Sequence, residues 1–505
     1  MLAFFALLAF ILIVNPVGYI GGAWDDWQYL NAARCWVENG PCLPGDHWQG
    51  RWPVIAPLAL STGLLGESRF AVGLPYLLAF LALCFLITRI GNRLAGPPIG
   101  WMVATLLLAI PAATIKMYQP SVEPIELALL AGSTLALLHY GDRHDARPIL
   151  LSGLLLGLAF QVRETALLAA LPLALGALAL KAPVRHIALA VTAFLLPLLV
   201  EMLVFGLQTG DPFHRRALSL GHTAVPSTEL RGEVAEGPPL FNSQLIANWR
   251  HVPGFRVHWL VDGPLNLFLN GAGGLTLLLN LFILPLAWKR LTGHDRSVIK
   301  WTTLVGLYFL FGLVYALAID PKPRMLLVPL LCSSLIFAIQ VRALWRGGVR
   351  LAAATVVASV LLAGAFGIAV QREIRSIEPA IAKAIADHPG KIETDAETRR
   401  HLALVEGADR LLPLSSDAPE LIVKVDIDCA LWSERLLGGK LEVVRVYPMG
   451  LVKRLPGELA SNICHYRYRE PVSELTVSNA KDRPRDDYDP SRGFRMIRKR
   501  LRQGD

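Results

Sequence analysis

The chain has 505 residues, of which 53% are hydrophobic and only 18% are charged. A soluble protein of this length needs more polar surface to cover its core, so the composition excludes an ordinary globular enzyme and indicates an integral membrane protein. The formal net charge of +9 would suggest nucleic-acid binding in a soluble chain. In a membrane protein it fits basic loops on the cytoplasmic side, so we expect no nucleic acid among the partners.

Hydrophobic runs recur along residues 1–370. A bilayer core of about 30 Å needs about 20 apolar residues per helix. The opening run, Met1–Ile20, lacks the basic start and the cleavage site of a signal peptide, so we interpret it as a retained transmembrane helix. The sequence predicts about eleven such helices, near residues 1–20, 70–90, 98–115, 121–140, 148–162, 166–181, 186–206, 265–288, 299–318, 324–343 and 350–370.

The basic residues of the connecting loops alternate along the chain. Every second connection is rich in lysine and arginine, and these connections hold Arg89, Arg93, Arg143, Arg147, Lys181, Arg185, Lys289, Arg290, Arg296, Lys300, Arg342, Arg346 and Arg350. The positive-inside rule places this set, and the N-terminus with it, in the cytoplasm. Loops 21–69 and 207–264 and the tail 371–505 are then extracytoplasmic.

The tail, residues 371–505, differs from the membrane domain 1–370. It begins with a helical pattern, "QREIRSIEPAIAKAIADHPG", and continues with the strand-like runs "ELIVKVDI" and "LEVVRVYPMGLVKRL". These patterns predict a small soluble α/β or α+β domain after an all-α membrane domain. The last residues, 482–505, are highly charged and are expected to be frayed.

Six cysteines are present. Cys84 and Cys332 lie inside apolar runs, and the other four lie in predicted extracytoplasmic parts as the pairs Cys35 with Cys42 and Cys429 with Cys464. Two disulfides can form if these parts face an oxidising compartment. No spacing resembles a zinc site, so we expect no metal and no cofactor.

Ionisable residues gather at the predicted outer ends of the helices. Asp25 and Asp26 follow the first span, and alone they fit an ordinary polar turn at a helix end. The others are Arg51, Glu123, Glu126, Arg163, Glu164, Lys322 and Arg324. Charges at membrane depth are costly and normally face partners or a wet cavity. A single site on one side of the membrane therefore explains them together.

Both signs of charge suit one kind of chemistry at that place. A carboxylate can serve as general base for a hydroxyl acceptor. Arginines can bind a phosphate leaving group and stabilise its developing charge. A phosphate at the membrane surface, on an apolar tail, belongs to a lipid-linked donor, so the pattern predicts group transfer from a polyprenyl phosphate.

The motifs and their order resemble those of the GT-C superfamily of membrane glycosyltransferases. The most similar branch is family 39-like and holds the protein O-mannosyltransferases and the lipid A aminoarabinose transferase. "WDDWQYLNAARCWVENG" resembles the first-loop motif of that branch, with Asp25, Asp26 and Tyr29 at its key positions. "GDHWQGRWPVIAPLAL" resembles the segment with a Lys-Pro-Pro-Leu run, and its basic residue is Arg51.

Three later segments extend this resemblance over residues 1–345. "SVEPIELALL" resembles a Leu-Asp-Pro segment, with Glu123 in place of the aspartate. "GLAFQVRETALL" resembles a segment with a lysine where this chain has Arg163. "TGDPFHRRALSLGHT" resembles a loop of the bacterial members. Charge sign is kept at each substituted position.

The resemblance implies an inverting sugar transfer on the extracytoplasmic side. Asp25 would be the base, and Asp26 and Glu123 would tune it or shape the acceptor site. The residues implied to bind the donor phosphate are Arg51, Arg163 and Arg324, and those implied to support the acceptor are Tyr29, Glu126, Glu164 and His222. A short interfacial helix from about Gln28 to Asn39 would hold the first-loop residues. The expected setting is the inner membrane of a bacterium, with the site facing the periplasm, a polyprenyl-phosphate sugar as donor, and a lipid, glycan or protein as acceptor.

Three alternatives stay open from the sequence. A transporter or flippase of lipid-linked sugars would also carry intramembrane charges, although no internal repeat is visible. An O-antigen-ligase type of glycan transferase would rely on His214, Arg215, Arg216 and His222 in the long loop and would not need Asp25. A non-enzymatic assembly protein would leave the charged residues unexplained.

Overall fold

The chain was analysed as a computed structural model. It describes residues 1–14, 24–223, 259–317, 319, 322–375, 377–388, 390, 392–394, 411–413, 420–425, 429, 441–448 and 462–468. The chain divides into two compact units. The helical unit comprises Met1–Val17, Tyr29–Gly66 and Phe70–Ile368, and the second unit comprises Gly18–Gln28, Glu67–Arg69 and Ala369–Asp505.

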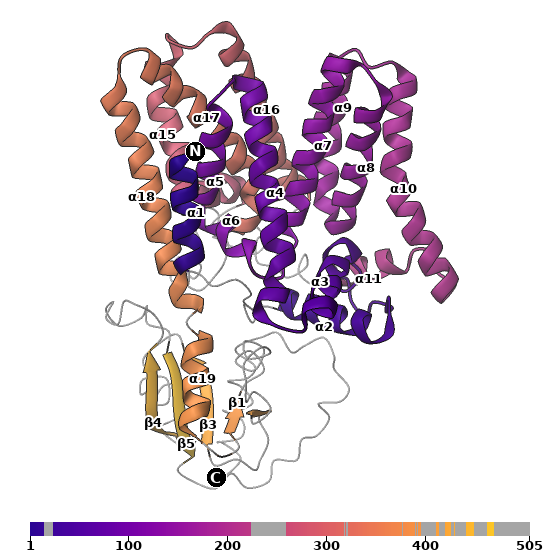
Figure 1. Cartoon of the computed structure of the whole chain (residues 1–505), viewed down its shortest axis with the longest axis vertical. Helices are drawn as coiled ribbons and strands as arrows, with labels where there is room; N and C mark the ends of the chain where they lie inside the picture. The colour runs from indigo at the N-terminus through magenta and orange to yellow at the C-terminus, as the bar shows by residue number, and fades with distance from the viewer. Residues whose placement is uncertain are drawn as a thin grey trace. The chain divides into compact units, whose positions relative to one another are not determined.

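Helices make up the described part of the first unit (Figure 1). They are α1 (Leu2–Val14), α2 (Trp24–Asn39), α3 (Trp52–Leu65), α4 (Arg69–Ala95), α5 (Ile99–Leu108), α6 (Pro111–Thr114), α7 (Glu123–Arg143), α8 (Ala146–Val162), α9 (Ala170–Ala179), α10 (Val184–Thr209), α11 (His214–Thr223), α14 (Trp259–Phe268), α15 (Gly271–Trp288), α16 (Gly293–Phe311), α17 (Leu327–Arg346) and α18 (Arg350–Arg375). Short 3₁₀ or π turns occupy η1 (Ile115–Met117), η2 (Glu164–Ala169), η3 (Gly312–Ala316) and η4 (Pro323–Leu326). The predicted all-α membrane part is confirmed.

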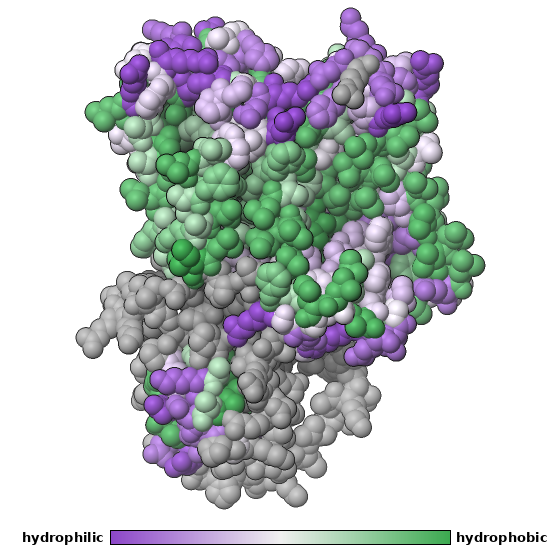
Figure 2. All heavy atoms as spheres, in the orientation of Figure 1, coloured by the Kyte–Doolittle hydropathy of each residue, from purple (hydrophilic) through white to green (hydrophobic). Residues whose placement is uncertain are grey.

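These helices form two neighbouring groups in the helical unit (Figure 1). In one, α7 and α10 pack on α8, and α9 packs on α7. In the other, α17 packs on α5, α15 and α16, and α1 packs on α5. Side chains on the visible face of this unit form a hydrophobic band between more hydrophilic ends (Figure 2), as expected where lipid surrounds a protein.

The described residues contain six helices that are long and apolar enough to cross a membrane, or up to seven if one bent pair counts as a single span. The predicted number of about eleven is therefore not reached by length and composition alone. Part of the difference lies in short apolar helices such as α1 and α8, which have 13 and 17 residues. The chain is an integral, multi-pass membrane protein.

Two predicted spans are broken rather than continuous. The prediction of one helix over 98–115 is wrong, because α5 and the segment Pro111–Met117 meet at 75°. Pro111 lacks a backbone N–H and cannot continue the helix from α5. The predicted span 265–288 is divided as well: α14 ends at Phe268 and α15 begins at Gly271.

Close backbone contact joins α8 to α10. A Cβ atom placed on Gly153 would lie 2.0 Å from the carbonyl oxygen of Ala190, and one on Gly157 would lie 2.3 Å from that of Phe194. Two glycines four residues apart let two helix backbones approach in this way. On the other side of α8, a hydrogen bond of 2.8 Å runs from the Ser133 hydroxyl to the Ser152 carbonyl. The middle of α8 is thus packed closely against α7 and α10.

Several of the basic connections meet at one end of the helical unit. Arg342, near the end of α17, donates to the carbonyl of Ala95 at the end of α4 and pairs with Asp295 at 2.6 Å. Arg93, also on α4, donates to the Leu138 carbonyl at 2.9 Å and pairs with Asp142 near the end of α7. The loops that the positive-inside rule groups together are therefore also in contact.

The second unit contains a helix and a mixed sheet. Helix α19 (Ile377–Asp387) precedes β1 (Ile392–Thr394), β2 (Leu411–Pro413), β3 (Glu420–Val425), β4 (Leu441–Pro448) and β5 (Asn462–Tyr468). The strand order is β2-β1-β3-β5-β4. β1 is parallel to β2 and β3, whereas β5 is antiparallel to β3 and β4. The prediction of a small domain with helix and strands is confirmed. Residues 449–455 of the second predicted run lie outside the described residues.

One face of this sheet is covered by α19. Ile381, Ala384 and Ile385 of the helix form a buried core with Ile422 of β3 and Tyr447 of β4. A disulfide joins Cys464 of β5 to Cys429, with 5.8 Å between their Cα atoms. The terminal segment 482–505 lies outside the described residues.

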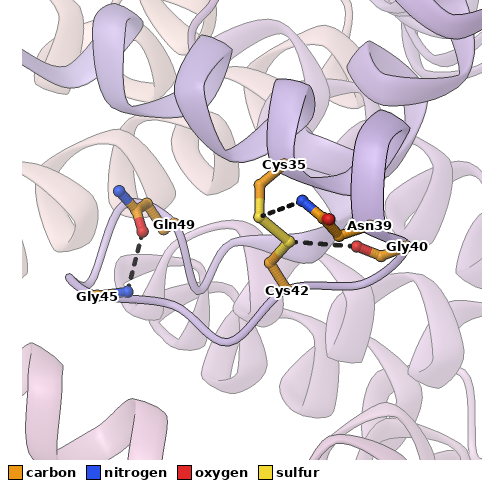
Figure 3. Close-up of a disulfide and its surroundings, with 6 residues drawn as sticks. All are labelled: Cys35, Asn39, Gly40, Cys42, Gly45 and Gln49. Atoms are coloured by element: carbon orange, nitrogen blue, oxygen red, sulfur yellow. Dashed lines mark hydrogen bonds between the residues drawn. A yellow bond between two sulfur atoms is a disulfide. The ribbon is translucent and has the colours of Figure 1, made fainter.

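A second disulfide closes the turn that follows α2. Cys35 and Cys42 are bonded, with 6.1 Å between their Cα atoms, and Cys42 Sγ lies 3.3 Å from the carbonyl oxygen of Gly40 (Figure 3). In the same loop the Gln49 side chain accepts a hydrogen bond of 2.9 Å from the Gly45 backbone (Figure 3). These contacts order the loop that leads to α3.

Candidate active site

Two glutamates open helix α7. Glu123 is its first residue, followed by Pro124, and Glu126 completes the first turn. Acidic residues in the first turn are favoured there because they complement the helix dipole. Both are buried, however, with exposed fractions of 2% for Glu123 and 7% for Glu126. A buried carboxylate needs a charged or hydrogen-bonding partner.

That partner is Arg163, which lies at the break between α8 and η2. α8 ends at Val162, and Arg163 adopts an extended backbone with φ −156° and ψ 132° before η2 begins. Its Nη2 lies 2.9 Å from Glu123 Oε1, and its Nη1 lies 3.2 Å from Glu126 Oε2. One guanidinium group therefore joins both acids of α7, and the break in α8 is what directs it there.

Two more side chains complete this cluster. Thr165 donates a hydrogen bond of 3.1 Å to Glu126 Oε1. Arg324, on η4, has its Nε 3.6 Å from Glu123 Oε1. The second carboxylate oxygen of Glu123, Oε2, is buried and has no hydrogen-bond partner among the described residues. We call Glu123, Glu126, Arg163, Thr165 and Arg324 the carboxylate–arginine cluster.

The cluster lines a small cavity of about 20 Å³, which is room for about one water molecule. The rest of its wall is mainly apolar and is formed by Leu127, Phe309, Leu313, Met325, Leu327 and Val328. Polar groups thus converge on one side of the cavity and apolar side chains line the other. Ligand pockets have volumes of about 300–1,000 Å³, so the lining side chains must move before a ligand larger than water can enter.

Tyr29 and Arg51 lie beside the cluster and are joined to each other. Arg51 Nη1 donates a hydrogen bond to the hydroxyl of Tyr29, and this contact links α2 to the start of α3. Arg51 also interacts electrostatically with Glu126 and Glu164, and Tyr29 does so with Arg163. Arg51 is the N-cap residue of α3, where the helix dipole disfavours a cation. Local helix stability therefore does not explain an arginine there.

Positive charge is in excess around the two glutamates of α7. Glu123 interacts electrostatically with Arg163, Arg324 and Lys116, and Glu126 with Arg163 and Arg51. Arg324 is the more accessible of the two cluster arginines, since its side chain is 23% exposed against 9% for Arg163. A buried surplus of cationic groups favours binding of an anion.

A second ion-pair group ties α11 to this region. Arg215 of α11 lies 2.8 Å from Glu201 of α10 and 3.7 Å from Glu164, and it donates a 2.7 Å hydrogen bond to the Gln161 carbonyl. Glu164 also accepts a hydrogen bond of 3.3 Å from Ser219. Arg215 is buried, and both terminal nitrogens of its guanidinium group have a partner in the protein.

Sequence reasoning missed Thr165, Gln161 and Glu201 as members of these groups. Glu201 could have been identified from the sequence, because it is an acid inside an otherwise apolar helix. Thr165 and Gln161 could not, because uncharged polar residues near helix ends are common. Of the predicted site residues, Glu123, Glu126, Arg163 and Arg324 lie together in the cluster, with Arg51, Tyr29 and Glu164 beside it.

Asp25 and Asp26 lie in the first turn of α2, which begins at Trp24, four residues earlier than predicted. Residues 18–28 are grouped with the second unit, so the described cluster does not include these two carboxylates. On α2 itself, residues three apart share a face, so Asp26 and Tyr29 lie on the same side. The side chain of His222 lies outside the described residues.

Known proteins support the resemblance drawn from the sequence. Residues 53–206 match the family model of the dolichyl-phosphate-mannose-protein mannosyltransferases. This match confirms the resemblance to GT-C superfamily membrane glycosyltransferases over the segment that includes Glu123, Glu126 and Arg163. No curated protein matches the chain in sequence.

Two solved structures resemble this chain along most of its length. One is ArnT from Cupriavidus metallidurans bound to undecaprenyl phosphate, with a TM-score of 0.46 and 12% identity, covering 92% of this chain and 97% of that one. The other is the same protein in the apo state, with a TM-score of 0.45 and 13% identity, covering 91% and 96%.

Proposed function

We propose that this chain is an inverting glycosyltransferase that moves a sugar from a polyprenyl-phosphate donor to a hydroxyl group of a lipid, glycan or protein. The observation that carries the proposal is the carboxylate–arginine cluster. It combines buried acids with arginines beside an apolar wall. Its members Glu123, Glu126, Arg163 and Thr165 lie in the segment 53–206 that matches a membrane glycosyltransferase family. A phosphate joined to an apolar chain is complementary to this arrangement, because its anionic group can contact the arginines and its chain the apolar wall.

The two arginines of the cluster and the neighbouring Arg51 divide into two roles. The two terminal nitrogens of Arg163 are already paired with Glu123 and Glu126, so we assign Arg163 the role of neutralising and positioning these acids. Arg324 and Arg51 are the residues we assign to the donor phosphate. Arginine suits this task because its planar, permanently charged fork binds phosphate oxygens in pairs.

The reaction follows from the chemistry of such a donor. Asp25 accepts the proton of the acceptor hydroxyl, and the hydroxyl oxygen forms a bond to the anomeric carbon of the sugar. The bond between that carbon and the phosphate oxygen breaks, and the electron pair leaves with the polyprenyl phosphate. Attack opposite the leaving group inverts the configuration. Arg51 and Arg324 stabilise the charge that develops on the phosphate.

We assign supporting roles in this chemistry to Glu123 and Asp26. Asp26 precedes Tyr29 by one helical turn of α2, and Tyr29 accepts the hydrogen bond from Arg51. Glu123 keeps one carboxylate oxygen without a hydrogen-bond partner in the described part of the chain, and we assign this oxygen to an acceptor or sugar hydroxyl. Glu126 and Glu164 hold the surrounding arginines in place.

We infer that the site faces the periplasm from the inner membrane of a bacterium. Two disulfides, Cys35–Cys42 and Cys429–Cys464, support an oxidising compartment for the loop after α2 and for the second unit. The basic connections gather at the opposite end of α7 and α8 from Glu123 and Arg163, which supports a cytoplasmic face there. A periplasmic reporter fused after residue 505 should be active, and a cytoplasmic one should be silent.

The test of the reaction is Asp25→Asn, with sugar transfer from a polyprenyl-phosphate donor measured in liposomes. We expect a loss of at least 100-fold in turnover, the scale of a missing general base, with donor binding unchanged. Glu38→Gln is the matched control, because Glu38 lies on the same helix and is exposed. Full activity of Asp25→Asn would remove Asp25 as the base.

The same assay separates the alternatives. Transfer that survives Asp25→Asn but is lost with Arg216→Ala and His222→Ala would favour a ligase-type mechanism. Arg216 is the better probe than Arg215, because Arg215 is buried in ion pairs and its removal would disturb the fold. Movement of intact lipid-linked sugar across the liposome, without transfer, would favour a flippase.

A further inference from the structure

Two histidines and a glutamate of the second unit converge far from the carboxylate–arginine cluster in the sequence. His388 follows the last residue of α19, Glu420 begins β3, and His465 lies within β5. Glu420 Oε2 lies 3.0 Å from His465 Nε2 and 3.4 Å from His388 Nδ1. Both imidazoles therefore direct a nitrogen at the same carboxylate oxygen.

Strand register explains why these side chains meet. In the antiparallel pair of β3 and β5, Glu420 is opposite Arg467, and Ile422 is opposite His465. Residues two apart on a strand share a face, so Glu420 and His465 lie on the face that carries Ile422. Ile422 belongs to the core beneath α19, and His388 at the end of that helix completes the group from above.

The spacing of the three groups matches a metal site. One ligand atom from each residue lies within 4.8 Å of the other two. In a tetrahedral zinc site with bonds of about 2.0–2.1 Å, neighbouring ligand atoms are about 3.3 Å apart. The separations of Glu420 Oε2 from the two imidazole nitrogens, 3.0 Å and 3.4 Å, lie on either side of this value. Two imidazoles and one carboxylate are also a known ligand set for zinc.

Arg467 fixes the carboxylate in the required orientation. Its Nη2 donates a hydrogen bond of 3.0 Å to Glu420 Oε1, so Oε1 is occupied and Oε2 is left for the two imidazoles. Hydrogen bonds to the outer atoms of metal ligands commonly orient them in this way. The arginine charge opposes a cation, but its side chain is 55% exposed, and solvent therefore screens that charge.

The ring of His465 lies inside the second unit. Its side chain has no exposed surface, and its Nε2 lies 3.0 Å from Glu420 Oε2. Its other ring nitrogen, Nδ1, is buried and has no hydrogen-bond partner among the residues that the structure describes.

We propose that His388, Glu420 and His465 form a binding site for a divalent transition-metal ion of the zinc type, which ties the end of α19 to β3 and β5. The fourth position of a tetrahedral ion would be open to water or to a further ligand. The role we assign to the ion is to fasten the helix to the sheet. It is independent of the proposed sugar transfer, and its tests use binding and stability instead of activity.

The test uses the full-length protein in detergent, purified without a histidine tag, stripped with a chelator and titrated with Zn²⁺. We expect one ion per chain by calorimetry, and a visible spectrum of tetrahedral type when Co²⁺ is used as the probe. Zn²⁺ should also raise the melting temperature of the stripped protein, because an ion that binds only the folded state stabilises it.

Variants assign the ion to its ligands. His388→Gln and Glu420→Gln should each weaken Zn²⁺ binding at least tenfold and abolish the Co²⁺ spectrum. His388 is only partly buried, so its variant should fold even if a change at His465 does not. His144→Asn is the matched control, because His144 is exposed at the end of α7 and has φ +50°, a conformation that asparagine tolerates; it should bind like the parent.

Two outcomes would overturn the proposal. Folded wild-type protein that shows no Zn²⁺ binding and no Co²⁺ spectrum would mean that the three residues form only a hydrogen-bonded group. Binding that is unchanged in both His388→Gln and Glu420→Gln would place the ion elsewhere. Neither outcome bears on the sugar-transfer proposal, which the Asp25→Asn assay tests separately.

Discussion

Arg163 and Glu123 form a buried ion pair of 2.9 Å that joins the end of α8 to the start of α7. The same guanidinium also holds Glu126, so three charges share one small volume with little contact with water. Paired charges of this kind contribute modestly to stability, but removing one partner leaves the others buried and uncompensated.

Arg163→Ala should destabilise the helical unit by about 3–5 kcal/mol, because Glu123 and Glu126 then stay buried without their main partner. The stability of Arg163→Lys should lie between that of the parent and that of Arg163→Ala, because a single ammonium group cannot replace the guanidinium fork that reaches both acids. Thermal unfolding in detergent measures the effect. Arg147→Ala is the control, because Arg147 is exposed on the same helix. An Arg163→Ala protein as stable as the parent would contradict the ion-pair geometry.

Gly153→Ala should destabilise the contact between α8 and α10. Its new methyl group would meet the carbonyl oxygen of Ala190 at 2.0 Å, so the helices must separate, and overpacking of this kind costs about 1–3 kcal/mol. Because α8 ends next to Arg163, sugar transfer should fall as well. Melting temperature and transfer rate are the two measurements. Gly293→Ala should change neither, since no atom lies within 4 Å of the corresponding position.

Thiol counting tests the two disulfides. The chain has six cysteines, and only Cys84 and Cys332 are free. Alkylation of the denatured, unreduced protein should therefore add two labels by mass spectrometry, and reduction beforehand should raise the number to six. Four or six labels without reduction would show that one or both bridges are absent in the cell.

The double variant Cys35→Ser/Cys42→Ser should lose about 2 kcal/mol of stability, the amount expected for opening a short loop. Because this loop connects α2 to α3, the contact between Tyr29 and Arg51 should weaken and transfer should slow. The matched control is Cys84→Ser, which leaves both bridges intact. A melting temperature equal to that of the parent would argue against a structural role for the Cys35–Cys42 bridge.

Alkaline pH should reveal the environment of Tyr447. Burial and a hydrogen bond of 3.1 Å to Asp387 raise the pKa of its hydroxyl above the ordinary value of about 10. A raised pKa in the folded state means that this stabilisation is complete below pH 10 and is lost as the pH rises through the folded-state value.

The tyrosinate absorbance of the parent minus that of Tyr447→Phe should therefore titrate above the range of exposed tyrosines. The melting temperature of Tyr447→Phe should also fall less steeply than that of the parent above pH 10. A difference spectrum that titrates at the ordinary value would show that the contact with Asp387 is not formed.

The sequence alone determined the class of this protein, its helical membrane part and the order of its charged motifs. These features are local: apolar length, loop charge and short motifs are read from neighbouring residues. It also singled out Glu123, Glu126, Arg163 and Arg324 as charges at membrane depth, because such charges are too costly to retain without partners.

The tertiary structure decided which of these charges face one another. Arg163 was expected to bind the donor phosphate, yet its fork is occupied by two acids 37 and 40 positions earlier in the chain. The sequence also did not predict the bend after α5 or the group of His388, Glu420 and His465, because each depends on how distant segments pack. Short-range sequence patterns indicate the helix or strand in which a residue lies. The pairing of buried charges depends instead on long-range packing, which the local sequence does not encode.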